Sequence, residues 1–299
     1  MTSILITALA AGLVAILVTV AIERLGGRKG GLLGTLPTTI VPAAVGFWWS
    51  SATTVDFRDA LFVVPAGMLL NAVFLLFWRE LPGRLPSWPF NVKLVAMVVL
   101  SMSGWLVLAL ALLAATEFYR AAGLPMVFWG WGFFCLALLF GVAACLGRRP
   151  APAGSNPVSM GTYLARGLLA ALAIGLAVAL AGISGPVIAG IVSIFPAIFI
   201  TTVVALWLSQ GETVPSGAVG PMMLGSTSVS AFALFAAAIM PVLGVAAGAV
   251  AAWLAAVALV TVPAWLLLQR LARNPVLECD NTNVAQTERC LPADRVGMS

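Results

Sequence analysis

Long apolar runs recur along the whole chain. Each is about 18 residues or longer, which is enough for a helix to cross a hydrocarbon layer of about 30 Å. The expected helices cover residues 3–22, 31–49, 60–78, 92–115, 125–146, 164–183, 186–208, 219–240 and 244–269. Only 8% of the 299 residues are charged, against about 25% in a soluble domain. We therefore expect an all-α integral membrane protein with nine transmembrane helices.

The first apolar run could also be read as a secretory signal peptide. No basic residue precedes Ile4, and the run continues without a break to Ile22, where Glu23 and Arg24 follow. A cleaved leader has a basic start and a shorter apolar core. The pattern favours a retained first span over a leader.

The basic residues sort strongly between the two sides that nine spans would define. One side holds only Arg58 and Arg120, and the other holds thirteen of the fifteen Lys and Arg residues. Basic residues in short loops collect on the cytoplasmic side of a membrane. We expect the amino terminus outside and the carboxyl terminus in the cytoplasm.

Two segments spell the same pattern 159 residues apart. Residues 31–37 and 190–196 both begin with Gly and end with Pro, and each is followed by Trp and Ser, at Trp48 and Ser50 and again at Trp207 and Ser209. A constant offset of this kind indicates an internal duplication.

The odd number of spans gives the two copies opposite orientations. We expect a first four-helix repeat that starts outside (1–123), a linking transmembrane helix (124–147), a cytoplasmic linker (148–160), an inverted second repeat (161–273) and a cytoplasmic tail (274–299). Inverted repeats are the usual build of secondary transporters, because two similar halves can open alternately to each side. A duplicated structural bundle without transport is the alternative.

Each repeat resembles the GlpM family of small, four-span bacterial inner-membrane proteins. The matching residues are Gly31, Leu32, Leu36 and Pro37 in the first copy and Gly190, Ile191, Phe195 and Pro196 in the second. The resemblance covers most of the chain. It implies a bacterial inner-membrane location and a fused, inverted pair of four-helix units, and it implies little about chemistry.

The repeated prolines mark a candidate binding site. Pro37 and Pro196 each remove a backbone donor, which leaves the carbonyls of Leu33 and Val192 without their helical partners. Broken helices at matching positions of two halves are a pointer to a midplane site. Hydroxyls cluster around both prolines, on Thr35, Thr38, Thr39, Ser193, Thr201 and Thr202. Kinks that only improve helix packing are the competing interpretation.

A second polar locus falls in the third helix of each repeat. Asn71 is mid-span, where its amide needs a partner, and the 159-residue offset carries it to Ser230. Ser226 and Thr227 add hydroxyls nearby. We expect these residues and the two proline kinks to line one solute pathway, although small polar side chains also join helices without binding anything.

No carboxylate is securely mid-span and the chain has no histidine. A buried proton relay or a metal path is therefore hard to build, which favours a neutral, zwitterionic or anionic solute. Asp56, which we place with Arg58 and Asp59 in an outer loop, and Glu117 are the candidates for a coupling or gating role. Solvated helix-end charges are the simpler reading of both acids.

The sequence thus predicts a secondary transporter that works by alternating access, without a cofactor or metal and without enzymatic activity. A non-transporting subunit of a membrane complex is the alternative, and a lipid-modifying enzyme is disfavoured. The expected partners are the bilayer and a small solute, and nucleic acid is not expected. The solute, the coupling ion, the direction of transport, the existence of a homodimer and the pairing of Cys279 with Cys290 stay open.

Overall fold

The computed structural model is mainly helical, and its described residues contain no strand. It describes residues 5–6, 8–10, 12–13, 16, 36–38, 40–147, 160–181, 186–211 and 213–273. The helices are α3 (Ile40–Ser50), α4 (Thr54–Glu80), α5 (Phe90–Ala121), α6 (Met126–Leu146), α7 (Met160–Ala181), α8 (Pro186–Ser193), α9 (Ala197–Gln210), α10 (Thr213–Leu243), α11 (Val245–Ala256), the π-helix η1 (Val257–Thr261) and α12 (Val262–Arg273).

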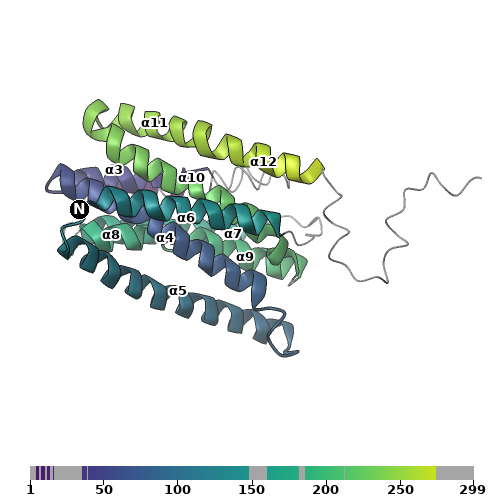
Figure 1. Ribbon diagram of the computed structural model, residues 1–299. Coiled ribbons are helices and arrows are strands. Elements are labelled where there is room, and N and C mark those ends of the chain that lie inside the picture. The colour runs from purple at the N-terminus through teal and green to yellow at the C-terminus, as the bar shows by residue number, and fades with distance from the viewer. Residues whose placement is uncertain are drawn as a thin grey trace, which may run out of the picture.

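Within the described residues, six helical segments are long and apolar enough to cross a membrane. They are Thr54–Glu80, Phe90–Ala121, Met126–Leu146, Gly190–Leu208, Gly217–Leu243 and Val245–Leu271. Their lengths and compositions are compatible with a helical membrane protein. Figure 1 shows an elongated bundle in which these helices run along one common direction.

Helices α4 and α10 form the centre of the bundle and run in opposite directions (Figure 1). About 72% of the most apolar window of α4 is buried, and 61% of that of α10, against 22% for α5 and α6. The core side chains therefore come mainly from the two central helices, while the peripheral helices keep one face exposed.

Helix α6 lies against both central helices, parallel to α4 and antiparallel to α10. Gly130, early in α6, lies close to Phe62 of α4 and Leu234 of α10. At the other end of α6, the Arg79 Nη1 donates to the carbonyl of Ala144 at 2.8 Å. A cation suits the carboxyl end of a helix, where the last carbonyls lack helical partners.

A proline inside α10 creates a backbone defect that α4 repairs. Pro241 has no amide hydrogen, so the carbonyl of Ala237, four residues earlier, loses its helical donor. The Arg58 Nε of α4 donates to this carbonyl at 3.2 Å. The contact joins the start of α4 to the last third of α10 and satisfies the orphaned group.

The outer loop that we expected at residues 50–59 is shorter in the structure, because α4 already begins at Thr54. Asp56, Arg58 and Asp59 all lie in the first two turns of the helix. The Thr53 Oγ1 accepts from the backbone amide of Asp56 at 3.1 Å and donates to its carboxylate at 2.8 Å. This N-terminal cap starts the helix at Thr54, six residues before the apolar run that guided the expectation.

The described residues of the first apolar run pack against α7. A methyl group added at Gly12 would lie 3.1 Å from the Cβ of Ala171. The side chain of Ile16 lies against Gly167. A Cβ added at Gly175 would lie 3.0 Å from the Cβ of Ala8. Small residues let these two segments approach closely, as is common for helices in membranes.

The other expected helices correspond to observed ones with shifted ends. The expected span at 92–115 lengthens to α5, and the span at 244–269 is α11, η1 and α12 in succession. The span at 186–208 is two helices, α8 and α9, because the chain breaks before Pro196. Most of the expected helix at 3–22, and residues 31–35 of the next, lie outside the described residues.

Gly190 provides a test of the close contact between α8 and α4. A Cβ at this position would lie 2.6 Å from the carbonyl oxygen of Ala60, so we expect Gly190→Ala to lower the free energy of unfolding by about 1–3 kcal/mol. The measurement is thermal or denaturant unfolding of the detergent-purified protein. Gly132→Ala is the matched control, because a Cβ there meets nothing within 4 Å. Equal stability of the two variants would contradict the packing described.

Candidate functional site at the break between α8 and α9

The chain turns sharply at Pro196, between α8 and α9. Pro196 has φ −76° and ψ 39°, and the Ala197 amide donates to the carbonyl of Phe195 at 2.7 Å. A hydrogen bond between residues i and i+2 around such a proline defines an inverse γ-turn. We call Ile194–Pro196 the Pro196 break.

The carbonyl that the break orphans is not the one that we expected. The carbonyl of Val192 accepts from the amide of Phe195 at 3.1 Å, because the last turn of α8 tightens to shorter hydrogen bonds. The carbonyl of Ile194 instead accepts from a side chain of another helix. The prediction for Val192 is therefore wrong, and the defect lies two residues further along the chain.

Asn71 of α4 satisfies the carbonyl of Ile194. Its Nδ2 donates to this oxygen at 2.9 Å, and the Asn71 side chain is almost fully buried. The amide also accepts, since the Trp105 Nε1 of α5 donates to the Asn71 Oδ1 at 2.9 Å. A single side chain thus joins α4, α5 and the Pro196 break, and the expectation that Asn71 needs a partner is confirmed.

An aromatic pair closes the same site from the α5 side. The rings of Trp105 and Phe195 meet edge to face, with centroids 5.6 Å apart. Trp105 is buried to all but 6% of its surface. Aromatic pairs in this geometry contribute about 0.5–1.5 kcal/mol beyond their buried area, so Trp105 holds the break through both a hydrogen bond and a ring contact.

A matching turn occurs 159 residues earlier. The Thr38 amide donates to the carbonyl of Leu36 at 2.7 Å across Pro37, which is the same bond as that across Pro196. Pro37 is buried, and α3 starts at Ile40 just after the turn. Thr35 and Thr39 lie outside the described residues.

Most of the candidate hydroxyls donate to carbonyls of their own helix. Their acceptors are Gly190 for Ser193, Ala197 for Thr201, Met223 for Ser226 and Leu224 for Thr227, all at 2.6–2.8 Å. Ser230 differs, because its Oγ is fully buried and has no hydrogen-bond partner in the described part of the chain. An unsatisfied buried hydroxyl is costly, which makes Ser230 the most unusual of these residues.

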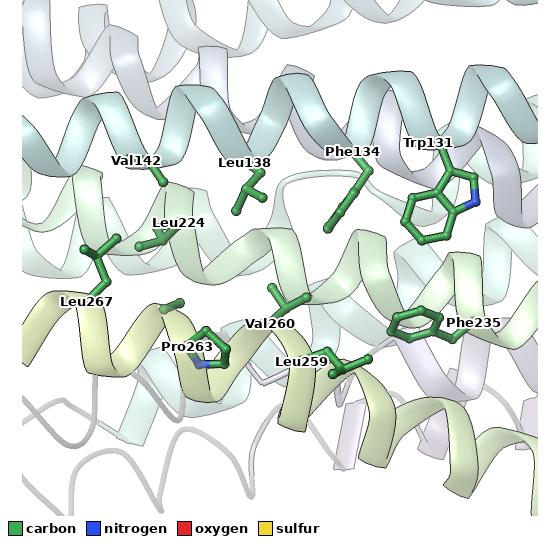
Figure 2. Close-up of a pocket in the computed structure, with 11 residues that line it drawn as sticks. Trp131, Phe134, Leu138, Val142, Leu224, Phe235, Leu259, Val260, Pro263 and Leu267 are labelled. Atoms are coloured by element: carbon green, nitrogen blue, oxygen red, sulfur yellow. The ribbon is translucent and has the colours of Figure 1, made fainter.

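Apolar side chains fill the space beside Asn71. The Ile194 side chain lies directly on Gly67, where an added Cβ would be 1.2 Å from the Ile194 Cδ1. The Met68 Sδ lies 3.7 Å from the Asn71 Nδ2. In this conformation the Pro196 break is closed by packing. A pocket of about 340 Å³ instead lies between α6, α10 and α12 (Figure 2).

The two acids proposed for coupling lie at one end of the bundle, away from the break. Asp56 lies in the first turn of α4, where its carboxylate accepts from the hydroxyl of the capping residue Thr53. Glu117 lies near the end of α5, where its Oε2 is 3.6 Å from the Arg120 Nη1. Arg120 also pairs with Asp59 at 3.3 Å. These contacts describe helix-end charges that link α4 to α5.

Sequence reasoning singled out Asn71 and Pro196, which the structure brings together through the carbonyl of Ile194, but it did not place Trp105 or Phe195 beside them. Trp105 carries a usable signal, because its indole N–H at the centre of an apolar run needs an acceptor. Among the residues that the structure describes, no group of three or more His, Cys, Asp or Glu could hold a metal ion. No protein-family model matches the chain, and neither a curated protein nor a solved structure is significantly similar to it.

The contact between Asn71 and Trp105 can be tested by a double-mutant cycle. Asn71→Leu and Trp105→Phe each remove one end of the hydrogen bond, so we expect a coupling energy of about 0.5–3 kcal/mol in the free energy of unfolding. The control pairs Asn71→Leu with Ser101→Ala, because Ser101 bonds to Trp78 instead. Coupling no larger than in the control pair would refute the Asn71–Trp105 bond.

Proposed function

We propose that the chain is a secondary transporter for a small neutral, zwitterionic or anionic solute. The observation that carries the proposal is the Pro196 break, which interrupts a helix within an apolar segment. The carbonyl of Ile194 loses its helical donor there and accepts from the Asn71 amide of another helix. Interrupted helices expose backbone groups that can coordinate a solute inside a membrane. The solute would compete with Asn71 for these groups.

The proposal includes two inverted repeats. The positions of the helices support two repeats, because α4 begins at Thr54 and α10 begins at Thr213, again 159 residues apart. These two helices are antiparallel, as repeats inverted across the membrane plane require. The γ-turns at Pro37 and Pro196 add a second matched feature.

The contact of the first apolar run with α7 also supports an inverted pair. Under the 159-residue offset, Ala8 corresponds to Gly167, Gly12 to Ala171 and Ile16 to Gly175. The contacts are reciprocal: Gly12 meets its own counterpart, Ile16 meets the counterpart of Ala8, and Ala8 meets the counterpart of Ile16. Self-complementary contacts of this type are what a two-fold axis produces.

The outward faces of the same two segments repeat as well. Leu5, Leu9 and Leu13 are 62%, 62% and 59% exposed, and their counterparts are exposed to 60%, 62% and 60%. These counterparts are Leu164, Leu168 and Leu172. We infer a tandem, inverted, GlpM-like duplication with nine spans, in a bacterial inner membrane.

A non-transporting structural or partner-binding subunit is the second candidate. It is favoured by the contact of Ile194 with Gly67, which fills the space beside Asn71 with apolar side chains. A transporter would have to open this contact in another conformation, whereas a structural bundle would keep it closed.

The proposed orientation can be tested by thiol labelling in whole cells. In a cysteine-free variant, we expect Ala52→Cys, in the turn between α3 and α4, to react with a membrane-impermeant maleimide. Ser87→Cys, in the turn between α4 and α5, should react only after permeabilisation, because the basic side faces the cytoplasm. The reverse pattern would overturn the orientation.

Alternating access can be tested at Ser230 without knowing the solute. In oriented proteoliposomes of the same variant, we expect Ser230→Cys to react slowly with impermeant maleimide added on either side, because each open state admits water. Ser101→Cys is the matched control, since Ser101 is equally buried but lies on α5 beside Trp78. The transport proposal fails if the thiol at position 230 is as unreactive as the control from both sides.

Flux measurements then identify the solute. Uptake of labelled amino acids, sugars and carboxylates would be measured one compound at a time in wild-type proteoliposomes. We expect Asn71→Leu to slow uptake of the transported compound by about tenfold, the effect of losing one buried hydrogen bond, with Ser101→Ala unchanged.

A further inference from the structure

The pocket between α6, α10 and α12 differs from the Pro196 break in place and chemistry. It is lined by Trp131, Phe134, Leu138, Val142, Leu224, Phe235, Leu259, Val260, Pro263, Ala264 and Leu267. None of these side chains is charged, and Figure 2 shows them between α6, α10 and the segment formed by η1 and α12. Leu259 is 65% exposed and Trp131 is 41% exposed, so the pocket opens to the surface of the bundle.

The pocket has the length of an extended acyl chain. Along α6 it extends from Trp131 to Val142, which is about 16 Å at the rise of an α-helix. The cavity volume is about 340 Å³, and its lining side chains are all apolar or aromatic. A narrow apolar slot of this length suits one extended acyl chain.

A local distortion of the last helical segment shapes one wall. The π-helix η1 lies between α11 and α12, where the amide of Val262 donates to the carbonyl of Val257, five residues earlier. Leu259 and Val260 of this wider turn line the pocket together with Pro263. π-turns inside α-helices often occur at functional sites.

A cation lies just beyond one end of the pocket. Arg270 is exposed, and it is three residues after the lining residue Leu267 on α12, so the two share a helix face. The opposite end is closed by the aromatic residues Trp131 and Phe235 (Figure 2). A ligand with an apolar chain and an anionic head would place its head at Arg270.

We propose that this pocket binds one acyl chain of an anionic phospholipid, with the phosphate of its headgroup at Arg270. The surrounding bilayer gives an acyl chain no hydrophobic gain on entering the pocket. Selectivity among lipids then depends on the headgroup, where a basic residue near the membrane surface attracts anionic lipid. The lipid belongs to the leaflet that the end of α12 faces.

Native mass spectrometry of the full chain tests the proposal. The protein is titrated with phosphatidylglycerol and phosphatidylcholine that carry identical acyl chains. We expect preferential retention of phosphatidylglycerol, and Arg270→Gln should reduce this preference by about fivefold. Arg84→Gln is the control, since Arg84 is exposed but paired with Glu80 at 3.8 Å and does not line the pocket.

A second variant separates the pocket from the headgroup contact. Leu259→Trp adds bulk at an exposed lining residue and should reduce retention of both lipids. Leu254→Trp, at a 56% exposed position of α11 outside the pocket, should not. The proposal is overturned if Arg270→Gln leaves the lipid preference as high as Arg84→Gln does, or if Leu259→Trp retains as much lipid as Leu254→Trp.

Discussion

A single backbone carbonyl determines how the candidate site is built. Pro196 interrupts a helix within an apolar segment, and the carbonyl of Ile194 is left to face a neighbouring helix. No water competes for such a group in a hydrocarbon layer, so it must be satisfied inside the protein. Asn71 does so from α4, and it orients its own amide by accepting from Trp105. Helices α4 and α5 are thereby joined to the break between α8 and α9.

The same principle operates at the other defects of the bundle. Pro241 frees the carbonyl of Ala237, and Arg58 binds it from the neighbouring α4. Arg79 binds carbonyls of Ala144 and Gly147 at the end of α6. These polar side chains of the described bundle complete backbone hydrogen bonding, and small residues such as Gly190 bring the helices close enough for such contacts to form.

This arrangement is consistent with either a rigid bundle or a transporter in a closed state. Under the transport proposal a solute would replace Asn71 at the carbonyl of Ile194, and a buried hydrogen bond of this kind contributes only about 1 kcal/mol net. Ser230, which corresponds to Asn71 under the 159-residue offset, has no partner in the described residues.

The sequence by itself determined the helical, membrane-type character of the chain, the two prolines and the need of Asn71 for a partner. These properties depend on composition, on the missing proline amide and on local spacing, all of which act along the chain. Only the tertiary structure decided which carbonyl is orphaned, that Trp105 and Phe195 complete the site, and that Arg58 reaches Ala237. Each of these depends on how far a helix turn tightens and on which residues of distant helices meet, and no local pattern specifies either one.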